Sequence, residues 1–353
     1  MSFYGQITTI TVDPIESLAQ SPSLVGLGLS MEAQQGNEIV HDLLLDQAWS
    51  ETPIETEPYF KRWNMRLYSS AGKEGVESMA AVWEQMRMHF YDNKNTTIKS
   101  VPKSIFELSP SIEGLLGRTG NQPTTYPYDL GNMAQVFGSM HRAGMEDFSL
   151  WDDPAFNYDM IDASRQILSG LFEADYVELI TTWKTEPRNE TLLANAGDRL
   201  ISRLSSLDRV MSAQDATSLS TWIYAARFQT YNSTLQDIFE YNARLQITGW
   251  GPDGEKNDYA SKAWGGLIRT YYIPRWQIFI AYLAEMEVAK YNEEALKDRL
   301  REFEVKWQHQ KLRDEKPVAA SEALLSILTV KFADQVNQDW MRTKALAKRQ
   351  KWD

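Results

Sequence analysis

The sequence contains no cysteine and only four histidines among its 353 residues. Without cysteine, the chain forms no disulfide, no zinc–thiolate site and no cysteine nucleophile. His41, His89, His141 and His309 lie far apart and make no HExxH-type pair, and the GLLGRTG stretch at residues 114–120 lacks the Lys-Ser/Thr of a phosphate loop. We therefore expect neither a metal site nor another cofactor.

Long apolar runs and an excess of positive charge are also absent. No run approaches the roughly 18 residues that a membrane-spanning helix needs. The first twenty residues have neither the basic nor the apolar region of a signal peptide, so we expect no signal peptide in this chain. A net charge of −12 argues against nucleic acid or an anionic membrane surface as a partner.

The first fifty residues have the character of an α/β unit. Gln6–Val12 (QITTITV) is a short β-branched stretch, and the apolar run Leu24–Leu29 predicts a buried strand. A helix is expected to begin near residues 31–35 and to present apolar residues at a 3.6-residue period. Strand, loop and helix form the repeating unit of an α/β barrel. We interpret residues 1–50 as the C-terminal remnant of such a barrel.

The remainder of the chain is predicted to be helical. Amphipathic patterns indicate helices at residues 74–90, 158–179, 192–211 and 218–241, and another that carries Leu296, Leu300, Phe303 and Trp307. Residues 93–122 are rich in Asn, Ser, Pro and Gly, which predicts a long loop containing a short helix. The fold class is therefore mainly α, with residues 51–353 forming one all-helical C-terminal domain.

Glu32 is the carboxylate whose position invites a catalytic interpretation. It follows the predicted strand directly, in the segment GLGLSME, and barrel enzymes place catalytic groups just beyond the C-terminal ends of their strands. The alternative is that Glu32 lies in a first helical turn and complements the helix dipole.

Two further stretches, residues 241–252 and 258–276, are dense in aromatic and polar residues. Trp250 stands at a Gly-Pro turn, where an indole can cap a pocket more readily than it can enter a helix seam. Trp264 and Trp276 are expected to be packing residues where helices meet.

Four segments, in order, make a specific resemblance. They are GLGLSMEAQQGNEIVHDLLLDQAW, NYDMIDASRQIL, LSTWIYAAR and YNARLQITGWGPDGEKNDYASKAWGGLIRTYYIPRWQIF. Together they resemble the C-terminal part of the α-N-acetylglucosaminidase family, glycoside hydrolase family 89. That family combines a (β/α)8-like barrel with an all-helical C-terminal domain, and its members release terminal α-linked N-acetylglucosamine with retention of configuration.

The resemblance implies roles for three residues. Glu32 aligns with the family nucleophile, while Trp250 and Tyr259 align with residues that bind the sugar. Two positions depart from the family pattern: Ala33 replaces a glycine after the nucleophile, and Ser261 replaces an asparagine.

The resemblance also implies an expectation about activity. The acid/base glutamate of the family belongs to an earlier segment that has no equivalent before Gln6, so we expect an incomplete fragment that is inactive alone. The implied partner is an N-acetylglucosamine-terminated glycan, and the implied location is secreted, lysosomal or vacuolar. The alternative function is a non-catalytic helical module that binds carbohydrate or protein.

Overall fold

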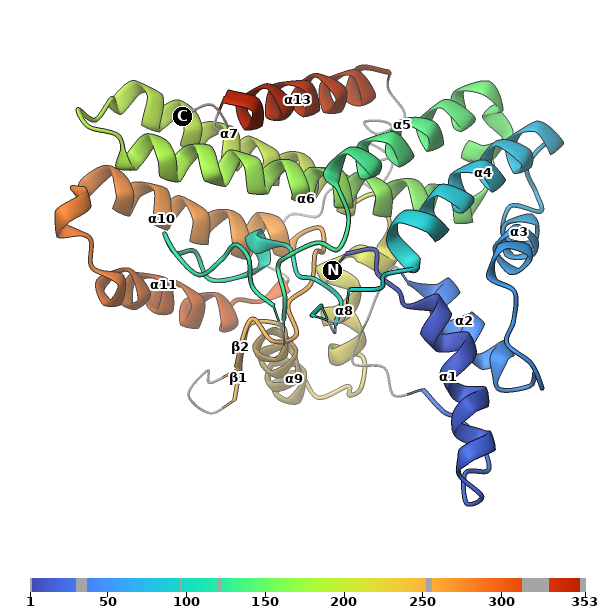
Figure 1. The fold of residues 1–353 in the computed structure, drawn as a ribbon. Coiled ribbons are helices and arrows are strands. Elements are labelled where there is room, and N and C mark those ends of the chain that lie inside the picture. The colour runs from blue at the N-terminus through green and yellow to red at the C-terminus, as the bar shows by residue number, and fades with distance from the viewer. Residues whose placement is uncertain are drawn as a thin grey trace. The chain divides into compact units, whose positions relative to one another are not determined.

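The protein is mainly helical, as the periodicity predicts (Figure 1). The computed structural model describes residues 2–29, 37–95, 97–98, 100–119, 122–251, 256–312 and 330–349. Within these ranges the strands β1 (Gly249–Trp250) and β2 (Lys256–Asn257) are two residues long each. The α-helices are α1 (Ile7–Gln20), α2 (Glu38–Gln47), α3 (Thr56–Leu67), α4 (Lys73–Met86), α5 (Leu130–Glu146), α6 (Pro154–Lys184), α7 (Glu190–Met211), α8 (Leu219–Arg227), α9 (Ser233–Gln246), α10 (Ile273–Glu285), α11 (Glu293–Gln308) and α13 (Val330–Arg349).

The chain forms two compact units that differ from a simple division along the sequence. The first comprises Met1–Lys103 and Gly117–Gln166, and the second comprises Ser104–Leu116 and Ile167–Asp353. The long helix α6 contributes its first part to one unit and its second part to the other. The predicted boundary near residue 50 separates a barrel remnant from a helical domain, which is a different division from these packing units. That boundary stays a prediction.

In the first unit, helices that follow one another in sequence pack against one another. Contacts join α1 to α2, α2 to α3, α3 to α4 and α4 to α5. The core is aromatic: Trp83 donates its indole N–H to the Tyr68 hydroxyl at 2.8 Å, and its ring stacks on that of Tyr91. Because all three side chains are nearly or fully buried, this cluster fixes the start of α6 through the hydrogen bond from Tyr68 to Asp159.

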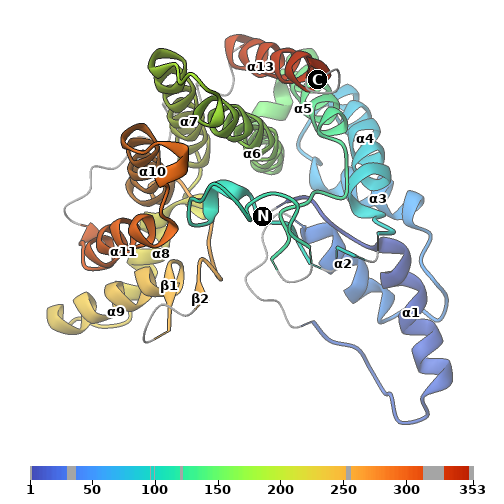
Figure 2. The same cartoon turned by 60° about the vertical axis from the view of Figure 1, so that its left-hand side comes forward.

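In the second unit, α10 packs against both α7 and α11, and α8 forms a hairpin with α9 (Figure 2). The Trp183 indole at the end of α6 donates to the carbonyl of Leu283 at 2.9 Å, which ties α6 to α10. Helix α13 is attached by ion pairs, because Arg203 of α7 bonds both Asp175 and Asp339. The unit is therefore a layered helical bundle with polar connections between its helices.

The strand predicted at residues 24–29 is not present among the residues that the structure describes, and the β-branched stretch before it is helical. The β-branched stretch Gln6–Val12 belongs largely to helix α1, in which Ile7 and Thr11 form the buried face and the Thr11 hydroxyl bonds the Ile7 carbonyl. Residues 24–29 adopt no regular structure, and Val25 is 96% exposed. A strand is stable only when a neighbour completes its hydrogen-bond ladder, and no described segment pairs with residues 24–29.

The later helix predictions are mostly confirmed. Helix α4, continued by a π-helical turn at Arg87–Tyr91, and helices α6, α7 and α11 cover the predicted stretches. The loop region at residues 93–122 contains a short 3₁₀ helix at Ile105–Glu107. The exception is residues 218–241, which form two helices instead of one. The break occurs because Asn232 caps α9, its side chain accepting the N–H of Leu235.

Gly265 marks a close backbone approach in the second unit, and this leads to a stability prediction. Its N–H donates to Thr217 and its carbonyl accepts from Leu219. A Cβ at this position would lie 2.6 Å from the Ser212 nitrogen, which is backbone and cannot rotate away. We expect Gly265→Ala to lower the free energy of unfolding by about 1–3 kcal/mol, measured by urea denaturation.

Gly138 provides the matched control for that substitution. It lies within α5, and a Cβ there would meet nothing within 4 Å. Because alanine is the better helix former by about 0.5–1 kcal/mol, Gly138→Ala should stabilise the protein. Equal effects of the two substitutions would show that the close contact at Gly265 does not control stability.

Candidate functional site

Trp250 and Tyr259, predicted to bind sugar, lie beside each other on a short hairpin. Strands β1 and β2 pair antiparallel, with Trp250 opposite Lys256. The ring centroids of Trp250 and Tyr259 are 6.0 Å apart, and the two side chains are 40% and 39% exposed. The Lys256 ammonium lies 5.5 Å and 5.8 Å from the two centroids. The hairpin thus presents an exposed aromatic pair with a cation over it.

The backbone at Asp258 places Tyr259 next to Trp250. Asp258 has a φ of +56°, a left-handed conformation that aspartate adopts more readily than most residues. Its N–H donates to the Thr248 carbonyl at 2.8 Å, and the N–H of Tyr259 donates to the Lys256 carbonyl at 3.2 Å. The first bond extends the pairing of the two strands, and the second closes a tight turn over residues 256–259. The aromatic pair is consequently fixed by backbone bonds rather than by ring contact alone.

A buried ion-pair network lies beneath this turn. Both Asp258 oxygens accept from the Arg275 guanidinium at 2.8 Å, and the Nε atom of Arg275 lies 3.1 Å from Glu304. Arg275 is fully buried and stacks over the Tyr271 ring at 4.7 Å. Burial raises the pKa of Glu304, and the nearby Arg275 opposes that rise. A bidentate guanidinium–carboxylate pair imposes orientation as well as charge balance, so Asp258 is held rigidly.

The residues after Tyr259 are secured by a second set of buried bonds. The Ser261 hydroxyl donates to the Glu107 carboxylate at 3.0 Å. The Tyr272 hydroxyl donates to the Lys262 carbonyl at 3.0 Å. Burial raises the pKa of Tyr272 well above its ordinary value, so its hydroxyl stays protonated and able to donate. Serine at position 261 therefore has a definite hydrogen-bonding role in place of the asparagine common in the family.

The start of β1 is fixed from the other side. The Thr248 hydroxyl donates to the Arg244 carbonyl at 2.7 Å and accepts from the Gln308 amide at 3.2 Å. Arg244 itself forms a fully buried ion pair with Glu240 at 3.0 Å. The exposed hairpin is thus anchored on both strands by side chains that are inaccessible to solvent.

Glu32, the predicted nucleophile, lies outside the described residues, as do residues 30–36 as a whole. The structure does describe where this segment ends. The Asn37 side chain accepts the N–H of Tyr4 at 2.9 Å and donates to the Ser2 carbonyl at 3.2 Å. Asn37 is buried, so the chain is pinned to the N-terminal residues immediately after the segment.

Several site residues escaped the sequence analysis. Lys256 belongs to no recognisable motif, and Arg275 and Glu304 lie on two later helices, α10 and α11. The available signal was a charged residue on an otherwise apolar helix face, as Arg275 is on the buried face of α10. Trp264 and Trp276 are buried, as predicted for packing residues.

The described residues show neither a metal-binding cluster nor a membrane-spanning helix. They contain no group of three histidine, aspartate or glutamate side chains placed to hold a metal ion. None of the described helices has the length and apolar character needed to span a membrane.

Family models match almost the whole length of the chain. Residues 59–329 match the C-terminal domain of α-N-acetylglucosaminidase. Residues 1–51 match the TIM-barrel domain of the same family. The N-terminal residues therefore correspond to the end of that barrel domain, even though the described part of them is not a strand.

Individual relatives agree with the family models. Human α-N-acetylglucosaminidase is 27% identical over 285 residues, which is 80% of this chain and 36% of the human protein. A family 89 glycoside hydrolase from Clostridium perfringens, solved with PUGNAc, has a TM-score of 0.77 and 22% identity. The same Clostridium enzyme solved with 2-acetamido-1,2-dideoxynojirmycin gives a TM-score of 0.79, and a variant with two Glu→Gln substitutions, solved with its substrate GlcNAc-α-1,4-galactose, gives 0.78. Each structural match covers 95% of this chain.

These relatives are much longer than the chain. It spans 36% of the human protein and 38% of the bacterial one, which is just over a third of their lengths. The match to the C-terminal domain model nevertheless extends over most of the 353 residues. The chain belongs to the α-N-acetylglucosaminidase family, of which it comprises mostly the C-terminal domain together with the end of the TIM-barrel domain.

Proposed function

We propose that the chain is part of a retaining glycoside hydrolase that releases terminal α-linked N-acetylglucosamine. The observation that carries the proposal is the family match over residues 59–329. It is supported by the exposed Trp250–Tyr259 pair on a rigid base. Within this proposal, residues 1–50 belong to the catalytic barrel and residues 51–353 form the helical domain.

The proposed chemistry uses two carboxyl groups. In a retaining enzyme they lie about 5–5.5 Å apart, one attacking the anomeric carbon and the other protonating the departing oxygen. We assign the attacking role to Glu32, which must be ionised to act. No residue of this chain is assigned as the proton donor, and the inactivity of the isolated chain stays a prediction. A variant of the Clostridium relative with two Glu→Gln substitutions holds its substrate, which is compatible with a pair of glutamates.

Trp250 and Tyr259 are assigned to binding. The apolar face of a pyranose ring packs well against an exposed indole, because both surfaces lose contact with water. Lys256 lies over the same two rings, where its ammonium can donate hydrogen bonds to a sugar oxygen. The ligands bound in the solved relatives, PUGNAc and GlcNAc-α-1,4-galactose, support N-acetylglucosamine as the sugar.

The test of this assignment is Trp250→Ala. We expect the dissociation constant for N-acetylglucosamine to rise about tenfold, equivalent to about 1.4 kcal/mol, when measured by titration calorimetry. Tyr259→Phe should have a smaller effect, since it keeps the ring.

Trp49 supplies the control for Trp250. It is 93% exposed and makes no ring contact in the described part of the chain. Trp49→Ala should leave sugar binding unchanged. If binding were equally insensitive to Trp250→Ala, the hairpin would not be the sugar platform. Binding that needs Trp250 without any hydrolysis in the complete protein would favour the non-catalytic carbohydrate-binding module instead.

A further inference from the structure

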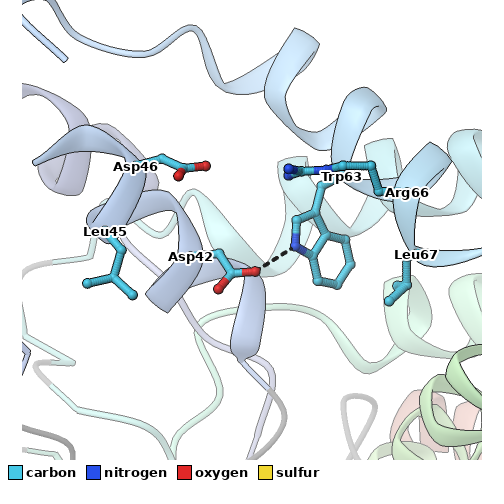
Figure 3. A pocket seen from close by; sticks show the side chains of 6 residues that line it. All are labelled: Asp42, Leu45, Asp46, Trp63, Arg66 and Leu67. Carbon is cyan, nitrogen blue, oxygen red and sulfur yellow. Dashed lines mark hydrogen bonds between the residues drawn. The ribbon is translucent and has the colours of Figure 1, made fainter. Parts of the chain in front are cut away.

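A groove in the first compact unit has the size and the lining residues of a second ligand site. It is far from the β1–β2 hairpin in the sequence. It lies between α2 and α3 and has a volume of about 470 Å³ (Figure 3). This volume falls within the range of about 300–1,000 Å³ that small-molecule sites occupy. Its lining residues are Asp42, Leu45, Asp46, Trp63, Arg66 and Leu67.

The two carboxylates of the groove are oriented by donors from the opposite helix. The Trp63 indole N–H donates to the Asp42 Oδ2 atom at 3.0 Å, and the Tyr59 hydroxyl donates to the Asp46 Oδ2 atom at 2.8 Å. Burial, followed by the bond to Asp46, raises the pKa of Tyr59 well above its ordinary value, so the phenol remains a donor. The described residues place no hydrogen-bond donor on the second oxygen of either carboxylate. Two acceptor oxygens are therefore available to a ligand.

The indole of Trp63 is held in place on its other side. It packs edge-on against Trp83 with ring centroids 4.7 Å apart, and Trp83 is buried. Together with the bond to Asp42, this contact fixes the plane of the indole at the groove. Trp63 thus provides a preorganised apolar surface beside the carboxylate acceptors, which reduces the entropy lost when a ligand binds.

Arg66 completes the polar lining. Its guanidinium and the Asp46 carboxylate both point into the space between the two helices (Figure 3). No carboxylate among the described residues lies within ion-pair distance of Arg66, so its donors remain available to a ligand. Two aspartates and one arginine leave the lining with a net negative charge, which disfavours sulfated or carboxylated ligands.

We propose that this groove binds a neutral pyranose of a glycan. Vicinal hydroxyls are donors and acceptors at once: they can donate to Asp42 and Asp46 and accept from Arg66. The ring's C–H face can pack on Trp63 and Leu45. The choice of a glycan as ligand rests on the proposed function. The geometry of the groove is independent of that function. The groove would hold a second part of the carbohydrate that the protein processes.

The experiment measures binding of GlcNAc-α-1,4-galactose in a Trp250→Ala background, so that the hairpin contributes little. The NMR signal of the Trp63 indole N–H, assigned with Trp63→Phe, is followed during titration. We expect this signal to shift, and the double variant Asp42→Asn/Asp46→Asn to weaken the residual binding about tenfold or more. These isosteric changes keep acceptors for Trp63 and Tyr59, and a thermal melt checks that folding is retained.

Asp298→Asn is the matched control, because Asp298 is an exposed aspartate on α11. It should leave the residual binding unchanged. No shift of the Trp63 signal at a saturating concentration of the disaccharide would overturn the proposal. An absence of aryl-glycoside hydrolysis would contradict only the proposed function. An aryl glycoside has a single sugar, so its hydrolysis does not require the groove to be occupied. The two proposals can therefore fail separately.

Discussion

Replacement of Arg275 by leucine is expected to lower the free energy of unfolding by about 3–5 kcal/mol. The reason is that Arg275 is fully buried and its positive charge balances the carboxylates of Asp258 and Glu304. Without it, two buried acidic groups lose the guanidinium that both of them contact. Urea denaturation, with the midpoint and slope fitted separately, measures the loss.

The control for this prediction is an ion pair that is exposed to solvent. Lys306 and Glu302 are both about 70% exposed and lie 2.6 Å apart on α11. Because such a pair is screened by water, Lys306→Met should cost about 0.5 kcal/mol or less. A comparable loss at the two positions would show that the buried network contributes no more to the free energy of unfolding than an exposed ion pair does.

The stability loss in Arg275→Leu should depend on pH. The pKa of Glu304 is raised in the folded protein by burial, so the folded state holds this proton more tightly than the unfolded chain does. Stability from this group therefore falls as pH rises from the unfolded value through the raised folded value. Arg275 opposes that rise, and its removal extends the fall to higher pH. We expect a larger loss at about pH 8 than at about pH 5, where protonation relieves the buried charge.

The same substitution bears on binding. Asp258 adopts its left-handed conformation while held by Arg275, and that conformation places Tyr259 beside Trp250. Arg275→Leu should consequently weaken sugar binding without altering any residue that touches the sugar. Arg275→Lys keeps the charge but loses the bidentate bond, so it should fall between the wild type and the leucine variant.

Apolar periodicity was sufficient for most helices. The spacing of Leu296, Leu300 and Trp307 predicts one face of α11, and all three are buried. Residue preference is a weaker guide: at Gln6–Val12 β-branched residues favour a strand, but packing of Ile7 stabilises a helix. Local preferences of this size are readily overridden by burial, because they amount to tenths of a kcal/mol per residue.

The sequence singles out the aromatic pair, but it does not reveal the buried ion-pair network that holds the pair in place. Trp250 and Tyr259 stand out because their segments resemble the family and surround a turn. Nothing in the sequence joins Asp258 to Arg275 and Glu304, since the three become neighbours only when α10 and α11 pack together. A charged residue on an apolar helix indicates a buried partner without identifying it. The rigidity of the site therefore depends on tertiary contacts that periodicity cannot reveal.

Glu32→Gln is expected to have the largest effect on turnover. In a preparation that hydrolyses 4-nitrophenyl α-N-acetylglucosaminide, we expect kcat to fall on the order of 10⁴-fold, the scale seen when single catalytic groups are removed from other hydrolases. The amide is close in size to the carboxylate but is a poor nucleophile, so binding should persist. The prediction follows from the proposed role of Glu32 and from its position after Leu29 in the barrel-domain segment.

A chemical rescue distinguishes a nucleophile from a proton donor at this position. In Glu32→Ala, azide can enter the vacated space and attack the anomeric carbon while the 4-nitrophenolate leaves. Attack from the side of the missing nucleophile inverts the centre, so the product should be the β-glycosyl azide. Loss of the proton donor would instead leave the first step intact and give the α-glycosyl azide, because azide would then displace the enzyme nucleophile. Formation of the α product, or full activity in Glu32→Gln, would transfer the attacking role to another carboxylate, whereas the β product ties it to Glu32.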